Sequence, residues 1–117
     1  MAATLPLNTF KTVTVNLTTS TQTPYTAPVN VTSIVLMAQV SNIDSTTHYV
    51  TASHYDGTNA TALVNHFAIA AFDAASILTG KLILETGQSI QMSCDSLNAG
   101  NTTSMQAVLS ILETSNS

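Results

Sequence analysis

The segment His48–Gly57, which reads HYVTASHYDG, holds two of the chain's three histidines and two of its three tyrosines. Side chains that bind metals or move protons are therefore concentrated in one short stretch. His48 and His54 are six positions apart, so a straight strand puts them on one face but about 20 Å from each other. His66 can approach His54 across a hairpin, but one cross-strand pair is not a ligand set. We predict no metal site here; polar positions on a sheet surface or at a subunit contact explain the histidines better.

The chain lacks the sequence patterns of the common catalytic sites. It has no G-x-S-x-G motif, and its four glycines form nothing that resembles a phosphate-binding loop. Glycoside hydrolysis needs two carboxyl groups about 5–9.5 Å apart across a cleft, whereas most acids here fall at expected strand ends or turns. These acids are Asp44, Asp56, Asp73, Glu85, Asp95 and Glu113. We therefore predict a protein that is not an enzyme and binds no cofactor.

Cys94 is the only cysteine, so no disulfide can form within the chain. It lies in the stretch IQMSCDS, where alternation puts it on the same strand face as Ile90 and Met92. Neither lysine is near it in sequence to activate a thiolate. We predict a small buried apolar residue rather than a nucleophile.

The same alternation orients the aromatic residues of the opening segment. Tyr49, Thr51, Ser53 and Tyr55 share one face of the expected strand, opposite His48. Aromatic rings beside small hydroxyl groups suit sugar stacking or a protein interface, and an ordinary solvent-facing strand fits equally well. These four residues are our first candidates for an interface.

Composition excludes several kinds of partner. Of the 117 residues, 44% are apolar and only 7% are charged, against roughly 25% charged residues in an average soluble protein. Two lysines and a net charge of −4 exclude binding to a phosphate backbone or to an anionic membrane surface. No apolar run approaches the roughly 18–20 residues that span a bilayer, and we expect no signal peptide. A surface so poor in charge is easier to explain if assembly buries it against copies of the chain or a partner.

Alternating apolar and polar residues predict a chain built from short strands. Lys11–Thr21 alternates β-branched residues, Val29–Val40 is nearly continuous in apolar residues and reads as a central strand, and Asp56–Asn59 predicts a tight hairpin. Further strands are expected at His48–Tyr55, at 60–69, 81–85 and 89–94, and at 105–113. A hairpin is expected at Thr86–Gly87, loops at 23–28 and 95–104, and a loop or one short helical turn at 73–80.

This spacing predicts one all-β domain over residues 11–117, after an extended arm at residues 1–10. Seven or eight short strands, with turns every 8–12 residues or so, are typical of an antiparallel β-sandwich or jelly roll. A chain of this length suits one such domain with a single core.

Four segments resemble a group of small tailed-bacteriophage virion proteins. They lie within the stretches PYTAPVNVTSIVLMAQVSNID, LVNHFAIAAFDAASILTGKLILETGQSIQMSC and LSILE, at Tyr25–Pro28, Ile34–Asp44, Ile69–Gln88 and Leu109–Glu113. The chain departs from the pattern at two places. Ala70 and Ala71 stand where a proline-containing turn is expected, and Gln88 replaces the acid after Gly87.

The resemblance implies a β-sandwich that coats or joins parts of a virion, as a capsid decoration (cement) protein or as a component of the head–tail neck. The implied partners are copies of the chain, most often in a trimer, and the major capsid or neck proteins. Phe10, in the arm, and Asn98 and Asn101, in the loop after Cys94, are candidates for contacts with neighbouring subunits. The alternative is a glycan- or host-binding module at a tail tip or fibre, with Tyr49 and Tyr55 in the site.

Overall fold

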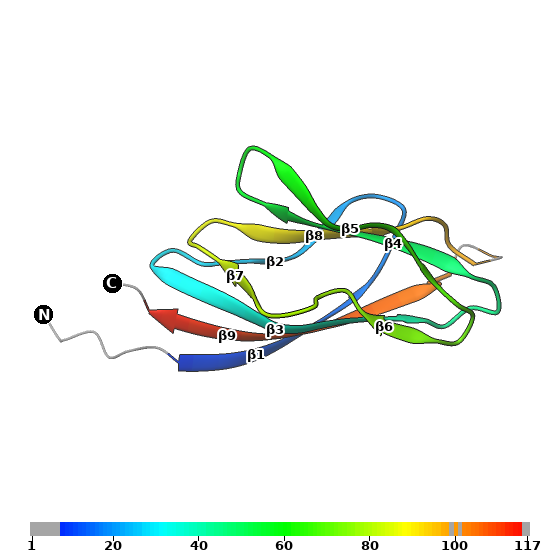
Figure 1. The fold of residues 1–117 in the computed structure, drawn as a ribbon, viewed down its shortest axis with the longest axis horizontal. Coiled ribbons are helices and arrows are strands. Elements are labelled where there is room, and N and C mark those ends of the chain that lie inside the picture. The colour runs from blue at the N-terminus through cyan, green and yellow to red at the C-terminus, as the bar shows by residue number, and fades with distance from the viewer. Residues whose placement is uncertain (1–7, 99, 101, 116–117) are drawn as a thin grey trace, which may run out of the picture.

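The computed structural model describes residues 8–98, 100 and 102–115 as two antiparallel β-sheets packed face to face (Figure 1). The described residues form nine strands. Sheet A contains, in spatial order, β1 (Asn8–Asn16), β9 (Met105–Ser115) and β3 (Val31–Asn42), followed by β6 (Ala74–Ser76) and β7 (Leu82–Leu84), which both pair with β3. Sheet B has the order β2 (Gln22–Thr26), β8 (Ser89–Cys94), β4 (His48–Tyr55) and β5 (Ala60–Ile69).

The strand pairing is that of a jelly roll. Because β6 and β7 pair with different parts of β3, they act as two halves of one interrupted strand. The first strand then pairs with the last, the second with the one before last, the third with the interrupted strand, and β4 with β5. This nested pairing confirms the predicted sandwich, and the interruption explains why nine strands appear where seven or eight were expected.

The core lies between the sheets because most strands bury alternate residues. In β9 the odd-numbered residues from Met105 to Glu113 are buried, whereas Gln106 and Val108 are exposed. Cys94 is 6% exposed and lies on the same face as Ile90 and Met92, as predicted. Burial raises the pKa of its thiol, so the thiolate that would act as a nucleophile is disfavoured.

The Asp56–Asn59 hairpin has the predicted turn chemistry. Gly57 has a φ of 101°, a conformation that favours glycine. Asp56 accepts hydrogen bonds from the backbone N–H groups of Thr58 and Asn59 at 2.9 and 2.8 Å. These contacts end β4 and start β5, which continues to Ile69 as expected.

Three local predictions are wrong. The segment around Pro24 is not a loop: it forms β2, where proline is tolerated because β2 is an edge strand with an irregular register. Ala74–Ser76 is a strand rather than a loop or helical turn. The turn at Thr86–Gly87 does not close a hairpin, because β7 pairs in sheet A and β8 in sheet B.

The last three residues of the arm predicted over residues 1–10 belong to β1. Asn8, Thr9 and Phe10 already pair with Thr114, Glu113 and Leu112 of β9, because the open edge of β9 offers them backbone partners. Residues 1–7 lie outside the described part of the chain. Within that described part, no helix is long and apolar enough to cross a membrane.

Candidate functional site

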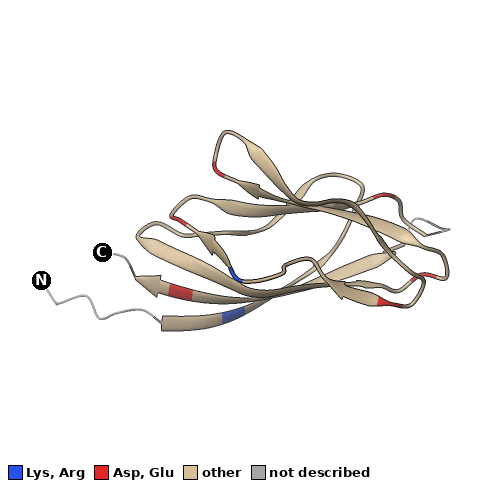
Figure 2. Ribbon diagram, viewed as in Figure 1, with Lys and Arg blue, Asp and Glu red and all other residues tan. Residues whose placement is uncertain are grey.

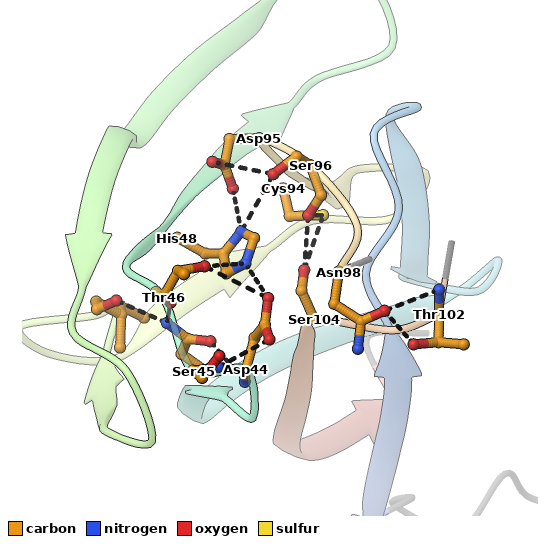
Figure 3. A network of polar contacts seen from close by, with 12 residues as sticks. Asp44, Ser45, Thr46, His48, Cys94, Asp95, Ser96, Asn98, Thr102 and Ser104 are labelled. Atoms are coloured by element: carbon orange, nitrogen blue, oxygen red, sulfur yellow. Dashed lines mark hydrogen bonds and ion pairs between the residues drawn. The ribbon is translucent and has the colours of Figure 1, made fainter. Parts of the chain in front are cut away.

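A buried histidine joins three segments at one end of the sandwich (Figure 3). His48, the first residue of β4, is 3% exposed. Its Nε2 lies 2.7 Å from Oδ2 of Asp44 in the β3–β4 turn, and its Nδ1 lies 2.9 Å from Oδ1 of Asp95, which follows β8. Local backbone contacts hold both acids, since Asp44 donates its N–H to Asn42 Oδ1 and Asp95 Oδ1 accepts the N–H of Tyr49.

This geometry stabilises a doubly protonated imidazole ring. Each ring nitrogen faces a carboxylate oxygen, and only the charged imidazolium can donate a hydrogen bond to both. Burial by itself disfavours the charge, but the hydrogen bonds to Asp44 and Asp95 outweigh it and raise the pKa of His48. The bond to His48 lowers the pKa of Asp44; for Asp95 burial acts upward, but bonds from Tyr49 and His48 lower its pKa overall.

The His48 cluster therefore stabilises the fold by linking the β3–β4 turn to the end of β8, rather than forming a catalytic centre. The ring is enclosed and both nitrogens are occupied, so neither is offered to a substrate. In the described residues, no group of three or more His, Cys, Asp or Glu side chains is placed to hold a metal ion. The spacing of Asp44 and His48 was a visible signal of this contact, but Asp95 comes from another strand end and only the fold brings it near.

The other two histidines do not meet. His54 pairs across the hairpin with Thr61, and its Nε2 lies 3.1 Å from Gln88 Oε1. His66 has a φ of 54° at the irregular part of the β4–β5 pairing. Its ring stacks on Tyr49, with ring centroids 4.1 Å apart.

The four predicted strand-face residues lie on the outer face of sheet B, but they form a row rather than a compact patch. Tyr49 and Tyr55 are about 20 Å apart along β4, and Tyr55 donates its hydroxyl to Gly57 O at 3.0 Å. Thr51 and Ser53, between them, help to line a small cavity of about 130 Å³. The row can therefore contact a partner over its length, with stacked rings at one end.

The remaining candidates differ in exposure. Phe10 is 74% exposed on β1. Asn98 is half-buried and holds its own loop, since its Oδ1 accepts hydrogen bonds from the backbone and hydroxyl of Thr102. Asn101 lies outside the described residues.

The sequence did not indicate an exposed apolar row on the outer face of sheet A. Phe10 pairs with Leu112, Leu112 with Ile34, and Ile34 with Ile83, so four large side chains from β1, β9, β3 and β7 lie side by side. Residues directly opposite each other in a sheet point to the same face. We call these four residues the apolar row. Phe10 and Ile83, at its ends, are 74% and 57% exposed.

A second buried polar cluster connects the two sheets. Tyr25 of β2 donates its hydroxyl to Glu113 of β9 and also lies 2.7 Å from Ser33 Oγ. Lys11 Nζ is 3.3 Å from the same carboxyl group. Burial, together with the hydrogen bond to Glu113, raises the pKa of Tyr25 to about 12.

Charges are few and lie mainly at the turns (Figure 2). Five of the six acids occupy connections between strands, and the sixth, Glu113, is buried in β9. Asp44, Asp73 and Asp95 follow β3, β5 and β8, respectively. Asp44 and Asp95 contact His48, and the backbone oxygen of Asp73 accepts the N–H of Asn42 at the end of β3, so the three acids lie at the end of the sandwich that contains His48. The sheet faces therefore present mostly uncharged side chains.

Comparison with known proteins supports the fold. No family model and no curated protein sequence matches this chain. The chain is similar to one in the acidic stable capsid structure of Helicobacter pylori bacteriophage KHP30, with a TM-score of 0.58 and 10% sequence identity, over 95% of this chain and 90% of that one. Identity this low is evidence of a shared fold only.

Proposed function

We propose that this chain is a non-enzymatic structural protein of a tailed-phage virion, which decorates or cements the capsid by binding capsid subunits. The main support is that its jelly roll matches, over nearly its whole length, a chain found in a phage capsid. The enclosed His48 and the uncharged sheet faces fit a role in assembly rather than in catalysis.

The second candidate is a component of the head–tail neck, which the sequence resemblance supports equally. Cryo-electron microscopy of the particle separates the two. Density for the jelly roll over the capsid lattice is the expected result, and density confined to a ring at the portal vertex supports the neck. Density found only at the tail tip or fibre would contradict both and favour the glycan- or host-binding alternative.

We expect the face of sheet B that carries Tyr49 and Tyr55 to contact the capsid. The Tyr49→Ala/Tyr55→Ala double variant should keep its fold, because both side chains lie on the outer face. It should bind particles that lack the protein about tenfold more weakly, since truncating an aromatic anchor typically costs about 1 kcal/mol or more. Co-sedimentation with particles measures this, with Thr14→Ala on sheet A as the control. Equal binding by the double variant would remove this face from the interface.

A further inference from the structure

The strands of sheet A place uncharged side chains on its outer face. By register, the residues that share this face with the apolar row are Asn8, Thr12, Thr14, Asn16, Thr32, Met37, Gln39, Ser41, Ala74, Ser76, Gln106, Val108, Ser110 and Thr114. None of them is charged. Lys11 lies on the opposite side of β1 and reaches toward Glu113, so it adds no charge to this face.

The area of the face is sufficient for an interface. The five strands of sheet A hold 38 residues, and each residue covers about 3.3 by 4.8 Å, so the face measures roughly 600 Å². Covering this surface on two copies buries about 1,200 Å², which is at the lower end of specific protein interfaces. The exposed Phe10 and Ile83 are then the largest apolar side chains that gain from burial.

We propose that this face binds a second copy of the same chain about a two-fold axis that passes between Leu112 and Ile34. Such an axis reverses the apolar row, so Phe10 of one copy packs on Ile83 of the other, and the reverse contact forms as well. The two sheets then stack about 10 Å apart, as in an aligned sandwich.

The charges favour a second copy as the occupant. The chain carries a net charge of −4, so two copies repel each other unless their acids stay apart. Contact through sheet A achieves this, because the acids lie at the turns or are buried. Within its strands the face offers no charge by which a partner of opposite sign would be selected, and its two apolar ends complement each other. This inference does not depend on the virion role.

Sedimentation velocity across a concentration series tests the pairing in solution. We expect a reversible dimer with a dissociation constant of about micromolar order or weaker, because the interface is small. Phe10→Glu places an acid against Ile83 at both ends of the contact and should weaken the dimer at least about tenfold. Ser53→Glu makes the same charge change on sheet B and should leave the dimer intact. A monomer up to about 1 mM, or equal weakening by both variants, would overturn the proposal.

Cross-linking tests the axis itself. In one copy Phe10 and Ile83 are three strand spacings, or about 14 Å, apart, whereas across the proposed interface they face each other on sheets about 10 Å apart. The Phe10→Cys/Ile83→Cys double variant in a Cys94→Ser background, treated with a short bifunctional thiol cross-linker, should therefore link two copies, whereas either single variant should link poorly. A trimer that persists in Phe10→Glu, or efficient linking by Phe10→Cys alone, would contradict the two-fold arrangement.

Discussion

The His48→Gln variant is expected to lose about 2 kcal/mol of unfolding free energy near pH 6 and distinctly less above neutral pH. In the wild type, the buried imidazolium donates to both Asp44 and Asp95. Hydrogen bonds to charged groups contribute about 1.5–3 kcal/mol each when buried. We expect about 2 kcal/mol for the two bonds together, less than two fully buried bonds would contribute, because the two carboxyl groups are 18% and 22% exposed.

The pH range of this effect follows from the direction of each pKa shift. The pKa of His48 is raised above its usual 6.5, so its contribution is fully present below pH 6.5 and disappears as pH rises through the higher folded value. The pKa values of Asp44 and Asp95 are lowered from 3.8, so their contribution is present above that value and disappears as pH falls through the folded values. The difference between wild type and variant should therefore be largest at mildly acidic pH.

Urea unfolding at a series of pH values from 4 to 9, or thereabouts, measures this difference. His66→Gln is the matched control, because His66 is exposed and stacks on Tyr49 at the sheet surface. The control should follow the wild-type profile. If His48→Gln parallels the wild type at every pH, the doubly paired imidazolium is not the protonation state that stabilises the fold.

Replacing Glu113 with alanine is expected to cost about 3 kcal/mol, the larger of the two effects at neutral pH. The change removes the acceptor of the buried Tyr25 hydroxyl and the partner of Lys11, and it leaves a cavity beside Ser33. Losing one partner of a buried polar cluster costs far more than the net value of the contact, because the remaining groups stay desolvated.

Glu113→Gln is the matched comparison. Its amide oxygen still accepts a hydrogen bond from the Tyr25 hydroxyl, and the lost ion pair is worth little because the Lys11 side chain is 48% exposed. We expect a loss of about 1 kcal/mol, measured by the same unfolding experiment. Equal losses in the alanine and glutamine variants would mean that charge, rather than the hydrogen bond between the sheets, is what the cluster requires.

Two segments that carry the phage resemblance meet in this cluster. Tyr25 comes from Tyr25–Pro28 and Glu113 from Leu109–Glu113, which are far apart in the chain but joined across the two sheets. Gln88, which stands in place of an acid in the resembling segment 69–88, also makes structural contacts. Its side-chain oxygen accepts the N–H of Glu85 and contacts His54. The segments that carry the resemblance therefore supply hydrogen bonds that connect the two sheets and stabilise a turn.

Local sequence patterns predicted the strands where the periodicity was clear. Alternation located β4 and β8, the apolar run located β3, and Asp-Gly located the hairpin. Local patterns failed where a segment becomes a strand only because a neighbouring strand pairs with it. Pro24 is accepted in β2 because one edge of that strand is unpaired, and the three residues of β6 are a strand only because β3 lies beside them.

The sequence by itself determined the all-β class, the buried Cys94 and the face of β4 on which Tyr49 and Tyr55 lie, because each depends on the two-residue period of a strand. Only the tertiary structure decided which strands are neighbours. It thereby placed Asp95 on His48, joined Tyr25 to Glu113, and assembled the apolar row from Phe10 to Ile83. The physical reason is that the two-residue period determines only which face each side chain takes, whereas the choice of neighbouring strands is made by pairing between segments far apart in the chain.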